Sequence, residues 1–177
     1  MTRSLCGLIL IGLCLVFSGC TSPPEKKSSP IGKWERDNGQ TGMARIVLRL
    51  KFEEGEKWRR EIVKVAIPET KTVSGSWKTR EIPESRAERK GETITPDFQL
   101  ELEYRISNQT DEIPIGATVV ERSSEGNSLL VRETWSAAIS EDKGSGKATL
   151  TLFRFDTKTV AGSDQLKVYT ERYDRVD

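Results

Sequence analysis

The sequence predicts an all-β fold, an antiparallel meander that closes into a barrel of about eight to ten strands. Apolar residues recur with a period of two along most of the chain, and turns rich in Gly, Asn, Asp and Pro separate the short periodic runs. Closure is expected because an open meander of this length leaves two strand edges unpaired. A two-sheet β-sandwich is the alternative. A membrane-spanning barrel is third, because no aromatic girdle recurs along the strands.

The expected strands follow one another at hairpin spacing. In chain order they are 31–34, which opens the domain, 46–52, 58–67, 73–82, 98–106, 117–122, 128–139, 148–155 and 165–173. Residues 53–56 predict a tight hairpin turn in which Gly55 takes a positive φ. Residues 84–92 are highly charged and lie between Pro83 and Pro96, so we expect a long mobile loop there, with a short surface helix as the alternative.

Residues 1–19 predict a secretion signal that forms a short helix. Arg3 supplies a positive charge, and Leu5–Phe17 forms an apolar run of 13 residues. A helix of this length spans about 20 Å at ~1.5 Å per residue, which is too short to cross a hydrocarbon layer of ~30 Å comfortably. We therefore expect a cleaved leader rather than an uncleaved membrane anchor.

The end of this leader resembles the lipobox of bacterial lipoproteins, because Phe17, Ser18 and Gly19 directly precede Cys20. The resemblance implies cleavage before Cys20, a diacylglyceryl thioether on its sulfur, and a further acyl chain such as palmitate on the new amino terminus. Each buried CH₂ contributes about 0.8 kcal/mol, so several chains hold a protein on a membrane. An exported, envelope-anchored protein is thus expected, in the outer membrane if the source is Gram-negative.

After the leader, the chain divides into a tether and one domain. Residues 20–30 combine the lipidated cysteine with a segment rich in Pro, Ser and Lys that lacks apolar periodicity. Ten residues of such a tether reach about 30 Å at ~3.3 Å each. Residues 31–177 have the length of a single domain with its own apolar core.

The composition excludes several kinds of catalytic and binding site in this domain. The chain has no histidine, which excludes Ser-His-Asp and Cys-His catalysis and removes the commonest zinc ligand. Cys6 and Cys14 belong to the leader, so Cys20 has no partner for an intramolecular disulfide. Loss of Arg3 with the leader leaves 27 basic and 27 acidic residues, a balance that disfavours nucleic-acid binding. We expect no enzyme, no cofactor and no metal site.

Gly32 and Trp34, separated by Lys33 at the start of the domain, resemble the Gly-x-Trp signature of lipocalins and lipocalin-like lipoproteins. In that family the Trp lies across the closed end of the barrel, and an arginine from a late strand stacks on its indole. The resemblance therefore implies that Trp34 closes the barrel. Either Arg154 or Arg172 is its expected partner, and the sequence leaves that choice open.

Aromatic and charged residues within the strands offer further candidates. Core packing is the expected role of the tryptophans, but Trp58, Trp77 and Trp135 are also candidates to line a cup for an apolar ligand, with Trp58 at its rim. The basic runs 57–60 and 86–90 are candidate sites for phosphate, acidic glycan or lipid head groups, although neighbouring glutamates favour neutralised surface charge. Glu101 and Glu103 have glycosidase-like spacing, which any exposed strand produces.

These features favour a lipid-anchored, lipocalin-like envelope protein that binds a small apolar molecule or another envelope protein without catalysis. A structural or assembly lipoprotein acting through its outer surface is the alternative. A carboxylate-based envelope hydrolase is the third interpretation.

Overall fold

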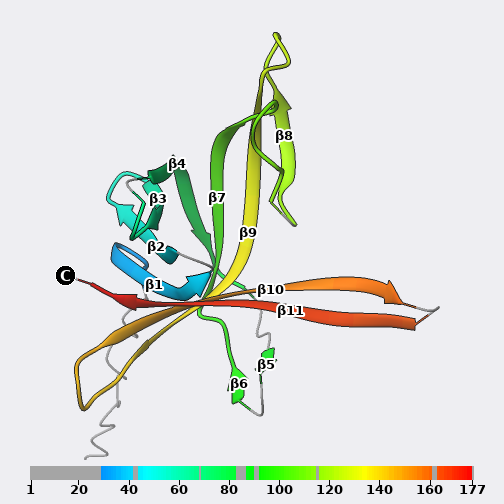
Figure 1. Ribbon diagram of the computed structural model, residues 1–177. Coiled ribbons are helices and arrows are strands. Elements are labelled where there is room, and N and C mark those ends of the chain that lie inside the picture. Colours follow the sequence, from blue (N-terminus) through cyan, green and yellow to red (C-terminus); the bar gives the residue numbers. More distant parts are fainter. Residues whose placement is uncertain are drawn as a thin grey trace, which may run out of the picture.

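The all-β prediction is confirmed by the computed structural model shown in Figure 1, which describes residues 29–41, 44–67, 69–82, 87–89, 92–114, 116–160 and 163–176. Within these ranges there are eleven strands and no helix. No helix there has the length and apolarity that crossing a membrane requires. The strands are β1 (Gly32–Thr41), β2 (Ala44–Glu53), β3 (Lys57–Lys64), β4 (Glu69–Arg80), β5 (Ala87–Arg89), β6 (Glu92–Ile94), β7 (Phe98–Ser107), β8 (Thr118–Arg122), β9 (Ser128–Glu141), β10 (Ala148–Val160) and β11 (Ser163–Arg175).

Eight of these strands form a closed antiparallel ring in the order β1-β2-β3-β4-β7-β9-β10-β11. The ring closes where Trp34 and Glu35 of β1 pair with Arg175 and Asp174 of β11, and the amide of Val176 donates to the carbonyl of Lys33 at 2.9 Å. The structure is therefore a barrel and not the alternative two-sheet sandwich. This closure removes the free edges that an open meander would leave.

Long strands extend beyond the ring in two directions. One edge of β9 pairs with β10 through residues 136–141 and with β8 through residues 129–132. The β10–β11 ribbon runs far out on one side, and β7, β8 and β9 project together on another (Figure 1). The part of the molecule in which all eight strands form a closed barrel is therefore shorter than its longest strands.

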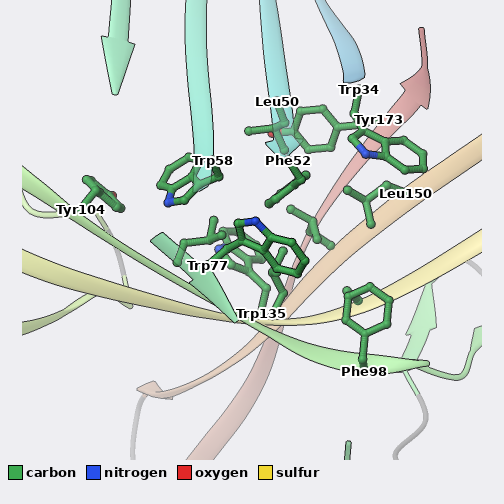
Figure 2. Close-up of a cluster of buried hydrophobic side chains, with 14 of the residues drawn as sticks. Trp34, Leu50, Phe52, Trp58, Trp77, Phe98, Tyr104, Trp135, Leu150 and Tyr173 are labelled. Carbon is green, nitrogen blue, oxygen red and sulfur yellow. The ribbon is translucent and has the colours of Figure 1, made fainter. Parts of the chain in front are cut away.

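The core fills the inside of this ring. Alternation of exposure along β9 places every second side chain between Leu129 and Ala137 in the interior. Figure 2 shows the large aromatic side chains converging there from different strands. The cluster comprises Trp34, Leu50, Phe52, Trp58, Trp77, Phe98, Leu100, Leu102, Tyr104, Ile106, Leu129, Val131, Trp135, Ala137, Ala148, Leu150, Leu152 and Tyr173.

Of two predictions about the connections between strands, one is confirmed and the other is wrong. Gly55 has a φ of 74° in the β2–β3 turn, as predicted. The expectation of a loop throughout 84–92 is wrong, because β5 pairs with β6 in a separate two-stranded sheet, with Ala87 opposite Ile94. A charged run lacks apolar alternation, but its backbone groups still form a ladder, so hydrophobic periodicity could not reveal this hairpin.

Several expected features fall outside the described residues. They are the leader and tether up to residue 28, with Phe17, Ser18, Gly19 and Cys20, and residues 86 and 90 of the second basic run.

Candidate functional site

The basic run 57–60 does not form one surface, because strand alternation divides it between the two faces of β3. Trp58 and Arg60 point into the barrel, where Trp58 is 2% exposed and Arg60 reaches the interior side chains of β7 and β9. Lys57 and Arg59 are exposed on the outside. The four residues therefore do not form the predicted basic cluster. Instead, they belong to two separate groups of side chains, one outside and one inside the barrel, which are described below.

On the outside, Lys33, Lys51 and Arg59 form a cationic row across β1, β2 and β3. Lys33 lies directly opposite Lys51, and Lys51 lies directly opposite Arg59. All three residues are exposed. Directly opposed side chains on neighbouring strands have Cβ atoms about 4.5–5.5 Å apart, at which like charges repel. This row brings together residues that are 18 and 8 positions apart in the sequence.

A hollow of about 310 Å³ lies beside the cationic row. It is lined by the three residues of the row together with Trp34, Arg49, Leu50, Glu61 and Val176. Four cations thus face one carboxylate around this hollow. A second hollow of about 280 Å³ is lined by Arg36 and Arg172 but also by Glu35, Asp37 and Asp174, so its carboxylates outnumber its cations. The first hollow is the better candidate for an anion.

Carboxylates form ion pairs with some of the cations around the first hollow but not with all of them. Arg49 pairs with Glu35 at 2.9 Å, and Arg59 lies 3.8 Å from Glu61. Lys51 pairs with Glu53 on its own strand. Lys33 forms no ion pair with any residue that the structure describes. Because Glu35 and Glu53 do not line the hollow, positive charge predominates at its surface.

A buried polar network lies inside the barrel. Glu133, which is 1% exposed, accepts hydrogen bonds from the Tyr104 hydroxyl, from Arg60 Nη2 at 3.2 Å and from Trp135 Nε1 at 3.0 Å. The guanidinium carbon of Arg60 lies 5.6 Å from the ring centroid of Trp58 and 5.3 Å from that of Tyr104. An arginine between two rings, with a carboxylate beside it, is an arrangement that keeps a buried charge paired.

Burial governs the ionisation of this network. Burial is the largest single influence on the pKa of the Arg60 guanidinium and lowers it. Glu133, Tyr104 and Tyr173 together raise it by more, so the pKa lies above its ordinary value. Burial raises the pKa of the Tyr104 hydroxyl, and the neighbouring carboxylate of Glu133 raises it further. Tyr173 follows the same pattern, with Glu171 as the neighbouring carboxylate. Arg60 is therefore charged and both phenols are neutral at physiological pH.

At the point where the ring closes, Arg175 stacks on Trp34. Its guanidinium carbon is 5.6 Å from the indole centroid, and Trp34 is fully buried. The expectation that Arg154 or Arg172 fills this role is wrong. Arg154 lies over Trp135 at 4.5 Å, and Arg172 is exposed beside the second hollow. The reason is register, since only the last residues of β11 pair with the start of β1.

The tryptophans proposed to line a ligand cup are buried in the core. Trp58, Trp77 and Trp135 are 2%, 9% and 5% exposed, so Trp58 does not have the exposure expected at a rim. Their indole N–H groups donate to the Glu103 carbonyl at 3.4 Å, to the Glu53 carbonyl at 3.2 Å and to the Glu133 carboxylate. Satisfied donors of this kind are typical of core tryptophans. A ligand role for these three residues stays a prediction.

The paired glutamates of β7 are each held by an arginine. Arg80 Nε lies 3.2 Å from Glu101, and Arg132 Nε donates to Glu103 at 2.7 Å. Across the described ranges, no group of three or more His, Cys, Asp or Glu residues is placed to hold a metal ion.

Comparison with known proteins adds no relative. No family model, no curated protein and no solved structure matches this chain.

Proposed function

We propose that this chain is an envelope lipoprotein whose barrel acts through its outer surface on another component of the envelope. The membrane attachment is the lipid on Cys20, and the segment up to residue 30 is the tether. The observation that carries the outer-surface role is the occupied interior. Eighteen buried residues form one cluster inside the ring, whereas the larger of the two hollows described above opens on the outside.

The path of the chain supports the same proposal. Trp34 Nε1 donates to the carbonyl of Pro30 at 2.7 Å, so the end of the tether is fixed against the barrel next to Lys33. A tether of ten residues reaches about 30 Å at ~3.3 Å each. The outer face of β1–β3 would therefore remain close to the membrane, among the proteins and lipids of the envelope.

The second candidate is a small molecule bound inside the barrel, in keeping with the lipocalin-like signature. The observation in its favour is a set of buried donors that find no partner among the residues the structure describes, namely Arg60 Nε, Arg154 Nε and Arg154 Nη1. Buried donors are normally satisfied, and an oxygen-bearing ligand would satisfy them. Native mass spectrometry of the protein purified from its own cells tests this candidate, because a bound small molecule gives a discrete mass increment.

Photo-crosslinking in the native host tests the outer-surface role. A photoreactive residue at Ser74 samples the exposed face of β4, directly opposite Arg59, and one at Lys143 in the β9–β10 turn is the control. We expect Ser74 to give one stoichiometric crosslinked product that Lys143 does not give. Equal or absent crosslinking at both positions would contradict the proposal.

Lipid attachment has its own test. Cys20→Ala removes the thiol that would carry the lipid, so we expect loss of incorporated palmitate analogue and release from the membrane fraction. Retention of label in this variant would contradict the proposed anchor.

A further inference from the structure

We infer that the hollow beside the cationic row binds the phosphate group of an anionic ligand. This inference rests on the outer-surface role proposed above and names the chemistry of that surface. Lys33, Lys51 and Arg59 line the hollow from three successive strands. Neighbouring strands lie about 4.8 Å apart, so the row spans about 10 Å, a distance over which long Lys and Arg side chains converge on one anion.

The row has an electrostatic cost in the absence of an anion. Like charges directly opposite one another on neighbouring strands are destabilising. Glu53 and Glu61 offset the charges of Lys51 and Arg59 along their own strands, but Lys33 lacks such a partner among the described residues. A bound phosphate removes this imbalance because its oxygens accept charge-assisted hydrogen bonds from several cations at once.

The shape of the hollow fits a phosphate ester better than a bare ion. Its volume of about 310 Å³ lies at the lower end of the range of about 300–1,000 Å³ typical of small-molecule sites. Among its apolar lining residues, Val176 is exposed and offers surface beside the cations, whereas Trp34 and Leu50 are buried beneath them. Arg59 supplies a planar pair of donors suited to two phosphate oxygens, and the two lysines supply compact charges.

Two sources offer this chemistry, a phospholipid headgroup and a soluble phosphate monoester. The test uses the full-length chain in neutral detergent micelles, with backbone amide chemical shifts as the readout. One arm adds glycerol 3-phosphate in solution. The other dopes the micelles with anionic phosphatidylglycerol, with zwitterionic, net-neutral phosphatidylcholine as its reference. We expect saturable shifts centred on Lys33, Lys51 and Arg59 in at least one arm.

Charge-matched double variants separate a specific site from general attraction. Lys33→Gln with Lys51→Gln should weaken binding at least about tenfold, the effect of losing one strong charge-assisted contact. Lys143→Gln with Lys147→Gln removes the same charge from the exposed β9–β10 turn and should leave binding unchanged. Arg59→Lys should also weaken binding, because the lysine cannot contact two oxygens in parallel.

The two arms decide the source. Saturation by glycerol 3-phosphate assigns a soluble ligand, and saturation with phosphatidylglycerol alone assigns a lipid headgroup. Shifts that do not saturate, or equal losses in the two double variants, would overturn the site. If a photoreactive residue at Ser74 crosslinks to one protein but no phosphate compound binds, this inference fails and the proposed function stands.

Discussion

Arg175 lies over the indole of Trp34, with 5.6 Å between its guanidinium carbon and the ring centroid. This contact joins the last strand of the barrel to the first. Arg175 also approaches Gly32, where a Cβ atom would lie 3.2 Å from Nη2, and it donates to the Ile31 carbonyl at 3.4 Å. Gly32 has a φ of 139°. The glycine and the tryptophan of the signature thus both accommodate the same arginine at the point of closure.

Replacing this arginine tests the closure contact. Arg175→Ala should lower the free energy of unfolding by about 0.5–1 kcal/mol, the strength of an exposed cation–π contact. Arg175→Lys should retain part of it. Urea unfolding followed by tryptophan fluorescence measures both. Arg122→Ala, at an exposed position on β8, is the control, with an expected change within about 0.5 kcal/mol. An equal effect of Arg122→Ala would contradict the assignment.

The glycine at Gly75 allows β4 and β7 to approach each other beneath Trp58. A Cβ atom there would lie 1.9 Å from the carbonyl oxygen of Glu103. Trp58 lies directly opposite Gly75, and its indole donates to that same carbonyl at 3.4 Å. Gly75→Ala should therefore cost about 1–3 kcal/mol or more through overpacking. Ser76→Ala, at the next and exposed position, should be nearly neutral in the same urea titration. Similar midpoints for the two variants would contradict this account.

The strands and the core were largely predictable from the sequence. Period-two alternation identified both Leu100 in β7 and Trp135 in β9 as strand residues, and the structure buries them together. Alternation is a local signal, because each side chain reports its own face of the sheet. The β2–β3 hairpin was local as well, since Gly55 marks its turn.

Contacts that depend on long-range register were not predictable in the same way. Lys51 and Arg59 flank one turn, so their opposition follows once that hairpin is placed. Lys33 joins them only through the β1–β2 pairing, which contains a register shift between Asp37 and Gln40. The pairing of Trp34 with Arg175 depends on how the ring closes, because the two residues lie at opposite ends of the domain. Neither pairing can be recognised from the residue pattern of one strand alone.

Glu133 and Arg60 form the buried charge pair of the interior, with side chains 2% and 21% exposed. Glu133→Gln leaves the arginine without its counter-charge and should cost about 3–5 kcal/mol. Replacing both, as Arg60→Met with Glu133→Leu, should recover most of that loss because no charge remains buried. A double-mutant cycle in urea, built from Arg60→Met, Glu133→Leu and their combination, measures the coupling. Additive effects of the two single variants would show that the pair does not act as a unit.

Asp111 connects the segment after β7 to two strands. Its Oδ1 lies 2.5 Å from Lys71 Nζ on β4, and its Oδ2 accepts from the amide of Ser107 at 2.9 Å. The hydrogen bond from Lys71 and then that from Ser107 lower the pKa of the carboxyl below its ordinary value. A lowered folded-state pKa stabilises the fold above the unfolded-state pKa of about 3.9, and this stabilisation is lost as the pH falls through the folded-state pKa.

Removing the charge of Asp111 should therefore alter how stability depends on acid. Asp111→Asn should cost a few tenths to about 1 kcal/mol near neutral pH, the range for a partly exposed ion pair. The difference from the native chain should shrink as the pH falls from about 5 towards 2, because the native carboxyl also becomes neutral. Urea midpoints at each pH give this difference, and Glu112→Gln removes the same charge from the exposed neighbouring residue. A difference for Asp111→Asn that stays constant over this range would show that the carboxylate charge does not stabilise the fold.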